Sequence, residues 1–158
     1  MAIDTKKVQD RRSVHYRTFD DLLTDAEQLA SKEVRQTGNW STGQILQHLA
    51  VSMNSSIDGF DFSLPAPVRF ILSLLMKRKF LYKALPAGFK AAGRFVPPDD
   101  VSTADGLAAI RNAVERQATA EEYVPHPGFG KLTRDEWINF HLRHAEMHMS
   151  FIVPAKTD

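Results

Sequence analysis

The sequence has no cysteine among its 158 residues. This absence excludes disulfides, thiolate metal sites, iron–sulfur clusters and a cysteine nucleophile. A transition-metal site in this chain therefore has to use imidazole and carboxylate ligands, which suit zinc, nickel, iron, manganese or copper.

An excess of charge of one sign is also lacking. The 20 basic and 19 acidic side chains give a formal net charge of +1, so overall charge indicates neither a nucleic-acid partner nor an acidic partner. Hydrophobic residues make up 43% of the chain and charged residues 25%. This composition and length are typical of a globular protein with one core, and we expect a single domain over residues 1–158.

Long apolar runs are missing as well. The longest, Phe70–Met76, is far shorter than the roughly 20 residues that cross a bilayer, so no transmembrane segment is expected. The first 17 residues are polar and contain no apolar core of a signal peptide. This pattern predicts a cytoplasmic protein.

Hydrophobic residues recur instead at helical spacing. A Ser or Thr precedes each of the four clearest helical stretches, where its hydroxyl can accept a hydrogen bond from a backbone amide of the first turn. We expect core helices over residues 19–35, 42–57, 103–122 and 134–153, capped by Thr18, Ser41, Ser102 and Thr133.

The predicted fold is an all-α four-helix bundle, because no segment indicates a β-strand. Residues 1–16 are charged and are expected to form a loose lead-in. Residues 60–101 are interrupted by several prolines and glycines, and they contain one further helical pattern over 68–85. A connection of this length suits a crossover between the second and third core helices.

The last predicted helix carries a stripe of histidine and aromatic residues. Trp137, His141, His144, His148 and Phe151 follow one another at spacings of four, three, four and three, which places them on one helix face. Burying several imidazoles in an apolar core is costly unless each finds a partner. A metal ion would provide one, and two histidines separated by four residues can share an ion.

A third ligand has to come from another helix. His48 lies mid-helix between Ile45 and Leu49, on or near the core side of the second predicted helix. The string from His144 to His148 is not the metalloprotease pattern H-E-x-x-H, since its glutamate, Glu146, stands two residues after the first histidine. At about 100° per residue Glu146 points away from the metal side, which argues against a protease.

Other interpretations of these residues stay open. A single histidine on an apolar face is more often a hydrogen-bonded core residue than a ligand, and H-x-x-x-H alone is a weak pattern. His141 and Trp137 suit a pocket wall or groups behind the ligands, and for His141 a fourth ligand is the alternative. His126 lies in a Pro/Gly loop that either covers the site or is plain surface. Gln44 either lines a cavity or marks the solvent boundary of its helix.

Three stretches resemble the DinB-like superfamily of metal-binding four-helix bundles. Residues 40–50, with the string Trp-Ser-Thr-Gly-Gln-Ile-Leu-Gln-His-Leu-Ala, look like the start of that family's second helix. Residues 126–133 are similar to the loop that precedes the last helix in one uncharacterised branch. Residues 135–151 look like the family's H-x-x-x-H helix. The resemblance implies metal ligands at His48, His144 and His148, with a long crossover between the second and third core helices.

The resemblance also suggests an activity. Characterised relatives include S-transferases that use bacillithiol or mycothiol, and a maleylpyruvate isomerase, in which the metal is thought to activate the thiol. Three imidazole ligands leave an open coordination position, which is typical of a catalytic rather than a structural site.

Three functions are therefore weighed. The first is an enzyme that uses one divalent ion to act on a small molecule. The ion is expected to be zinc or nickel before iron, manganese or copper. The reaction would be of the S-transferase or hydrolase type, and a low-molecular-weight thiol is the partner considered. The second is a bundle that binds metal or a small ligand without turnover. The third is a structural or interaction domain, and a homodimer is left open.

Residues 70–83 are first apolar and then basic. Such a helix most often covers its own core. Two alternatives are that it lies on a membrane surface or packs against a second subunit.

Overall fold

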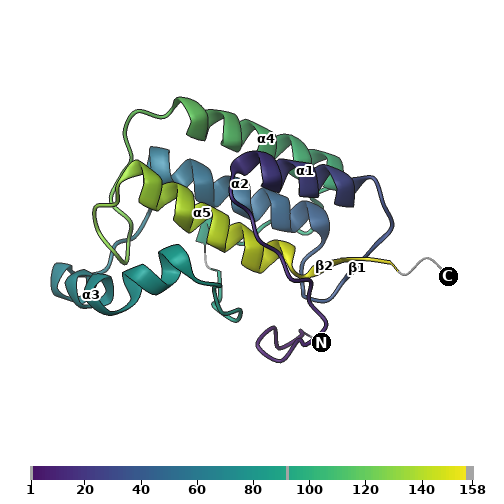
Figure 1. Cartoon of the computed structure of the whole chain (residues 1–158), viewed down its shortest axis with the longest axis horizontal. Helices are drawn as coiled ribbons and strands as arrows, with labels where there is room; N and C mark the ends of the chain where they lie inside the picture. Colours follow the sequence, from purple (N-terminus) through teal and green to yellow (C-terminus); the bar gives the residue numbers. More distant parts are fainter. Residues whose placement is uncertain (1, 92, 156–158) are drawn as a thin grey trace.

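The computed structural model describes residues 2–91 and 93–155 of the chain (Figure 1). This part is mostly helical, as predicted, and contains five α-helices, one 3-10 turn and one small two-stranded sheet. In chain order the elements are α1 (Phe19–Ala30), β1 (Val34–Gln36), α2 (Thr42–Asp58), α3 (Ala66–Tyr82), η1 (Gly93–Phe95), α4 (Thr103–Thr119), α5 (Arg134–Met149) and β2 (Ile152–Pro154).

The start of each core helix follows from its capping residue. The hydroxyl oxygens of Thr18, Ser41, Ser102 and Thr133 each accept a hydrogen bond from the backbone N–H three residues later, as the sequence predicted. In α1, α2 and α5 the side chain of that third residue accepts a bond from the capping residue's own N–H. This reciprocal box satisfies two of the free amides at each helix start.

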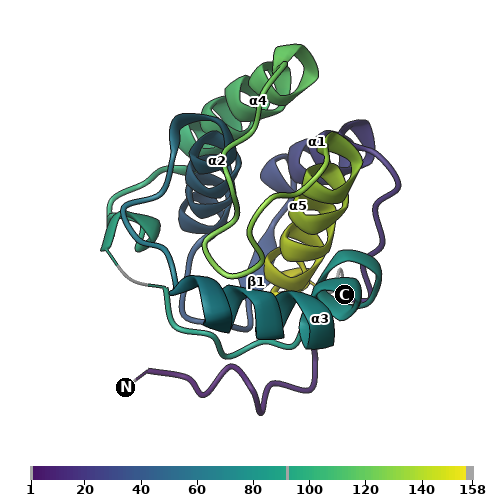
Figure 2. The ribbon, with the colours of Figure 1, turned by 90° about the vertical axis from the view of Figure 1, so that its left-hand side faces the viewer.

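Four helices pack around the main core. Helix α2 contacts α4 and α5, and α1 contacts the same two helices, so the contacts close into a ring. Figure 2 shows α3 on the opposite side of α5 from α4. Buried Leu, Ile, Met and Ala side chains of α1, α2, α4 and α5 fill the interior of the ring. No helix of the described residues is long and apolar enough to cross a membrane.

Two glycines allow α2 and α4 to approach closely at one end. A Cβ on Gly43 would lie 2.3 Å from the carbonyl oxygen of Val101, and a Cβ on Gly106 would lie 2.5 Å from the carbonyl oxygen of Gly43. Both obstacles are backbone atoms, so no side-chain movement relieves them. The start of α2, and with it the position of His48, depends on this contact.

Three of the predicted core helices end earlier than expected, and the prediction that no segment forms a strand was wrong. The third ends at Thr119 rather than at residue 122. The first ends at Ala30 rather than at residue 35, and the last ends at Met149 rather than at residue 153. The residues beyond these ends form β1 and β2, which pair antiparallel with Arg35 opposite Val153. A strand of three residues is too short to show alternation, and its partner is more than 100 residues away.

The N-terminal lead-in is also not loose. The guanidinium of Arg12 donates two hydrogen bonds to the carboxylate of Asp25, at 2.9 and 2.7 Å. Tyr16 is buried, and its hydroxyl also donates to Asp25. Its backbone N–H donates to Glu146 of α5 at 2.7 Å. These bonds attach residues 12–16 to both α1 and α5.

Candidate metal centre

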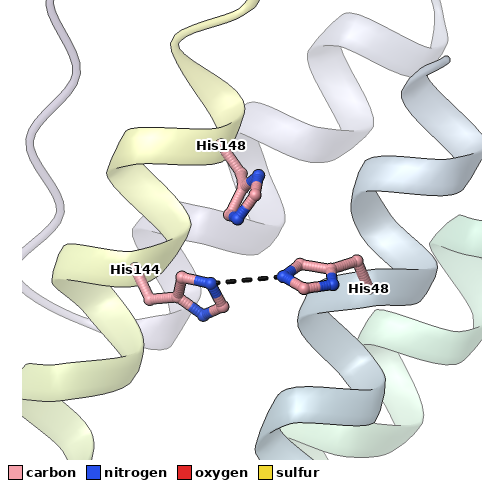
Figure 3. A group of neighbouring side chains, drawn as sticks. All are labelled: His48, His144 and His148. Carbon is pink, nitrogen blue, oxygen red and sulfur yellow. Dashed lines mark hydrogen bonds between the residues drawn. The ribbon is translucent and has the colours of Figure 1, made fainter. Parts of the chain in front are cut away.

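Three histidines from two helices bring their rings together inside the molecule (Figure 3). His48 comes from the middle of α2, whereas His144 and His148 stand one turn apart on α5. One ring nitrogen from each lies within 4.8 Å of the other two. The three residues that the sequence proposed as ligands are thus neighbours in space, although 96 residues separate His48 from His144 along the chain.

A backbone carbonyl orients the His48 ring. Its Nδ1 lies 2.7 Å from the carbonyl oxygen of Phe95, in the η1 turn of the crossover. Because a carbonyl oxygen only accepts, Nδ1 must carry the proton, and the neutral ring then has its lone pair on Nε2. A hydrogen bond of this kind on the far nitrogen is typical of metal-binding histidines.

The free lone pair of His48 points toward the α5 histidines. His48 Nε2 and His144 Nε2 are 3.2 Å apart. Two nitrogens bound to one tetrahedral zinc ion at 2.0–2.1 Å lie about 3.4 Å from each other. The pair therefore has about the separation that a shared ion requires, and a ring nitrogen of His148 lies within 4.8 Å of both.

The three imidazoles are held in the neutral form that metals bind. Burial lowers the pKa of His48, with the Phe95 carbonyl opposing this effect only partly. The pKa of His144 is also lowered well below its usual value, first by burial and then by the neighbouring histidines. The same two causes act on the pKa of His148. At neutral pH the cluster therefore offers lone pairs rather than positive charges.

Aromatic rings hold the imidazoles in place. The Trp40 ring stacks on His148 with 5.5 Å between ring centroids and also contacts His48 at 4.9 Å. Phe140 stacks on His144 at 5.9 Å. Sequence reasoning missed the Phe95 carbonyl, because every residue supplies a backbone carbonyl and no residue type marks this one. Trp40 was visible as part of the motif before α2, but its contact with His148 depends on how α2 and α5 pack.

A cavity of about 650 Å³ opens beside His148. Trp40, Ile45 and Phe151 form part of its apolar lining, and Lys6 and Lys90 add two cationic groups. The N-terminal segment closes one side, where the backbone N–H of Ile3 donates to the side-chain oxygen of Asn39 at 2.6 Å. The cavity is large enough for a small organic molecule next to the histidine cluster.

His141 lies outside this cluster. It is buried one turn before His144, and its ring stacks on Trp137. Ser56 Oγ donates to the carbonyl of Met53, so it accepts at 3.0 Å from His141 Nε2. That bond directs Nε2 to α2, and His141 is not part of the group whose nitrogens converge.

The other three predicted pocket residues lie elsewhere than the cavity lining. Gln44 completes the cap of α2 and donates to the carbonyl of Pro98, so it ties α2 to the crossover. His126 accepts backbone N–H bonds from Gly128 and Phe129 within its own loop. Trp137 is fully buried in a second apolar cluster with Phe129 and Leu132.

Glu146 is turned away from the histidines, as its helical position predicted. It forms an ion pair with Arg143 at 2.6 Å and accepts the backbone N–H of Tyr16. Arg143 in turn donates to the carbonyl oxygen of Tyr16. The carboxylate is fully engaged in fixing the N-terminal segment and is not available as a base at the cluster.

Comparison with known families identifies one match. Residues 8–155 match the family described as "Protein of unknown function (DUF1569)", and the chain belongs to this family. Searches of curated proteins and of solved structures found no match.

Proposed function

We propose that this DUF1569 protein binds one divalent transition-metal ion through His48, His144 and His148, and that the ion acts on a small molecule held in the adjoining cavity. The observation that carries the proposal is the convergence of three neutral imidazole nitrogens within 4.8 Å. Core histidines that only hydrogen-bond in a pair, as His48 Nε2 and His144 Nε2 can at 3.2 Å, do not require a ring nitrogen of His148 to lie within 4.8 Å of both.

The chemistry of the donor set supports zinc or nickel first. Imidazole also suits iron and copper, and manganese prefers oxygen ligands. When bound, such an ion supplies a Lewis acid that lowers the pKa of a water or thiol in its open position. A thiol S-transfer to an electrophile is the reaction we favour within this class, by analogy with the DinB-like superfamily.

We further propose that α1, α2, α4 and α5 form a DinB-like four-helix bundle. Support comes from the ring of contacts among these helices and from the crossover that holds α3 between α2 and α4. The metal-site residues occupy α2 and α5, which are the positions that the resemblance implies.

The chain's own residues have distinct roles in this proposal. The Phe95 carbonyl keeps the proton of His48 on Nδ1, so that Nε2 faces the ion. Trp40 limits ring movement and excludes water from one side of His148. Apolar cavity walls bind the body of the substrate, and Lys6 and Lys90 attract an anionic group on it.

Elemental analysis of protein purified without a histidine tag tests the metal site. We expect one ion per chain in the wild type and in His15→Ala, whose histidine is exposed and lies outside the cluster. His48→Ala and His144→Ala should both lose the ion. Retention of a full equivalent in either variant contradicts shared ligation.

A second assay separates catalysis from binding alone. The loaded protein is incubated with low-molecular-weight thiols and a panel of electrophiles, and loss of the free thiol is followed. Activity that disappears on chelation and returns with zinc or nickel is the expected result. An ion bound with no turnover of any pair assigns the protein to the non-catalytic alternative.

A further inference from the structure

Charge is divided very unevenly along this chain. Seven of the 20 basic side chains lie in residues 62–98, and none of the 19 acidic ones does. The remaining 13 basic residues share the rest of the chain with all 19 acidic residues. The near-zero net charge thus hides a strongly cationic segment that contains α3.

The same segment carries the exposed apolar surface. Of the large hydrophobic side chains that are exposed in the described residues, all but Ile3 lie between residues 62 and 96. Phe70, Leu74 and Leu75 are 70%, 74% and 72% exposed, which is unusual for side chains of this size. With Val68 and Ile71 they form one face of α3, since their positions recur at helical spacing.

This outer face is not needed to hold α3 on the protein. The opposite face packs Leu72, Met76 and Phe80 against the cluster around Trp137, and Leu81 is fully buried. Lys77 adds an ion pair with Glu136 of α5 at 2.7 Å. Helix α3 is therefore anchored through one side and presents a second apolar side to the exterior. The expectation that such a helix covers its own core therefore holds for one face of α3 only.

Free cations border the apolar face. Arg78, Lys79, Lys83 and Lys90 are exposed, and none of them forms an ion pair with a described residue. Tyr82 and Phe89 stand among them and are also exposed. An apolar helix face flanked by aromatic and cationic residues matches the boundary of a lipid bilayer, where chains, headgroups and water meet.

We infer that the outer face of α3 docks on the surface of an anionic phospholipid bilayer. Phe70, Ile71, Leu74 and Leu75 enter the acyl boundary, while Arg78, Lys79 and Lys83 lie among the anionic headgroups. Helix α3 lies on the bilayer and does not cross it, in keeping with its length. Phe89 and Lys90 also line the cavity beside His148, so the bound bilayer is next to the cavity rim.

Charge decides between a bilayer and a second copy of the chain. A twofold dimer formed through α3 would place the same free cations of both copies in one interface, with no acidic residue of the segment to neutralise them. An anionic bilayer complements these cations. The inference does not depend on the metal proposal, because no ligand residue takes part in it.

Sedimentation with vesicles tests the docking surface. The full-length protein is mixed with vesicles of phosphatidylcholine alone and with vesicles of an equimolar phosphatidylcholine and phosphatidylglycerol mixture. We expect binding to the mixed vesicles, weakening as salt is raised, and little binding to phosphatidylcholine. Arg78→Gln with Lys79→Gln should reduce binding about 25-fold, from about fivefold per cation. Leu74→Ser with Leu75→Ser should reduce it by roughly tenfold or more.

Matched controls show whether the effect belongs to this surface. Arg17→Gln with Lys32→Gln removes two exposed cations elsewhere, and Ile3→Ser removes the exposed hydrophobic residue outside the segment. Both should bind like the wild type, and circular dichroism should show every variant folded. Absence of vesicle binding by the wild type, or equal loss in the controls, overturns the inference. The inference is also overturned if ultracentrifugation shows a dimer that Leu74→Ser with Leu75→Ser abolishes, and if the wild type does not bind to vesicles.

Discussion

Two groups of buried and half-buried histidines lie along α5 or packed beside it, and they differ in where their nitrogens point. His48, His144 and His148 direct ring nitrogens at one another across the gap between α2 and α5. His126 and His141 instead bond to their own loop and to Ser56, with Trp137 and Phe140 packed against both rings. Burial lowers the pKa in both groups, so a lowered pKa does not by itself mark a metal site. Convergence of three ring nitrogens within 4.8 Å of one another is what distinguishes the first group.

Zinc-dependent stability should separate the two groups most strongly. At a free zinc concentration a thousand times the dissociation constant, the ion should raise the free energy of unfolding of the wild type by about 4 kcal/mol. His144→Ala should show no such increase. His141→Ala should keep it, even though this variant starts from a lower stability. Thermal or denaturant unfolding with and without zinc measures both effects, and an equal loss in the two variants would remove the distinction.

Acid should destabilise the metal-free protein through both groups, and for the second group the size of the effect follows from its pKa values. Burial lowers the pKa of His126 to about 4 and that of His141 to about 3. The unfolded chain takes up these protons as the pH falls through about 6.5, whereas the folded protein does not. Stability contributed by each is therefore present above pH 6.5 and is lost on acidification, by about 2 kcal/mol per histidine at pH 5. Denaturant unfolding between pH 7 and pH 5 measures the slope.

One substitution assigns part of the pH dependence of the free energy of unfolding to His126. His126→Gln should reduce the slope of the unfolding free energy against pH by the contribution of one histidine, because glutamine does not titrate. An unchanged slope in His126→Gln would show that the loop opens before it protonates.

Removing the hydroxyl of Ser56 should affect only the second group. Ser56 Oγ accepts from His141 Nε2 at 3.0 Å and from Gln117 Nε2 at 3.0 Å. Ser56→Ala leaves His141 Nε2 without a hydrogen-bond partner inside the core. The free energy of unfolding should fall by about 1–3 kcal/mol. Zinc affinity, measured by competition with a chromophoric chelator, should stay within a few-fold of the wild-type value. Ser55→Ala, whose hydroxyl bonds only to its own helix, is the neighbouring control.

The smallest effect is expected where the two groups touch. Phe140 contacts His126 at 4.8 Å and His144 at 5.9 Å between ring centroids. Phe140→Leu keeps an apolar side chain there and should cost about 1 kcal/mol of stability. Zinc affinity should fall only slightly. A loss as large as that of His144→Ala would mean that ring stacking, rather than the converging nitrogens, holds the site together.

Much of the fold and the membership of the histidine cluster could be predicted from the sequence. Helix starts depend on a hydroxyl three residues from an amide, which is a local relation, and all four predicted caps are present. Placement of His144 and His148 on one face follows from helical spacing alone. The choice of His48 needed a resemblance as well, because many residues of α2 are buried.

Other features had no local sign. β1 and β2 pair across the length of the chain, and each contains only three residues. The carbonyl of Phe95 orients His48, yet a backbone oxygen leaves no trace in the choice of side chain. Gln44 was expected either to line a cavity or to mark the solvent boundary of its helix, and neither alternative included the carbonyl of Pro98, which the crossover brings to its amide.

By itself, the sequence determined where the core helices begin, which faces of them are apolar, and that no metal ligand here is a thiolate. These properties depend on residue type and on spacings of three or four, which a helix converts directly into position. Tertiary structure alone decided which lone pairs meet, which histidines find another partner, and which face of α3 is left uncovered. Those outcomes depend on distances between segments far apart in the chain, and only packing sets such distances.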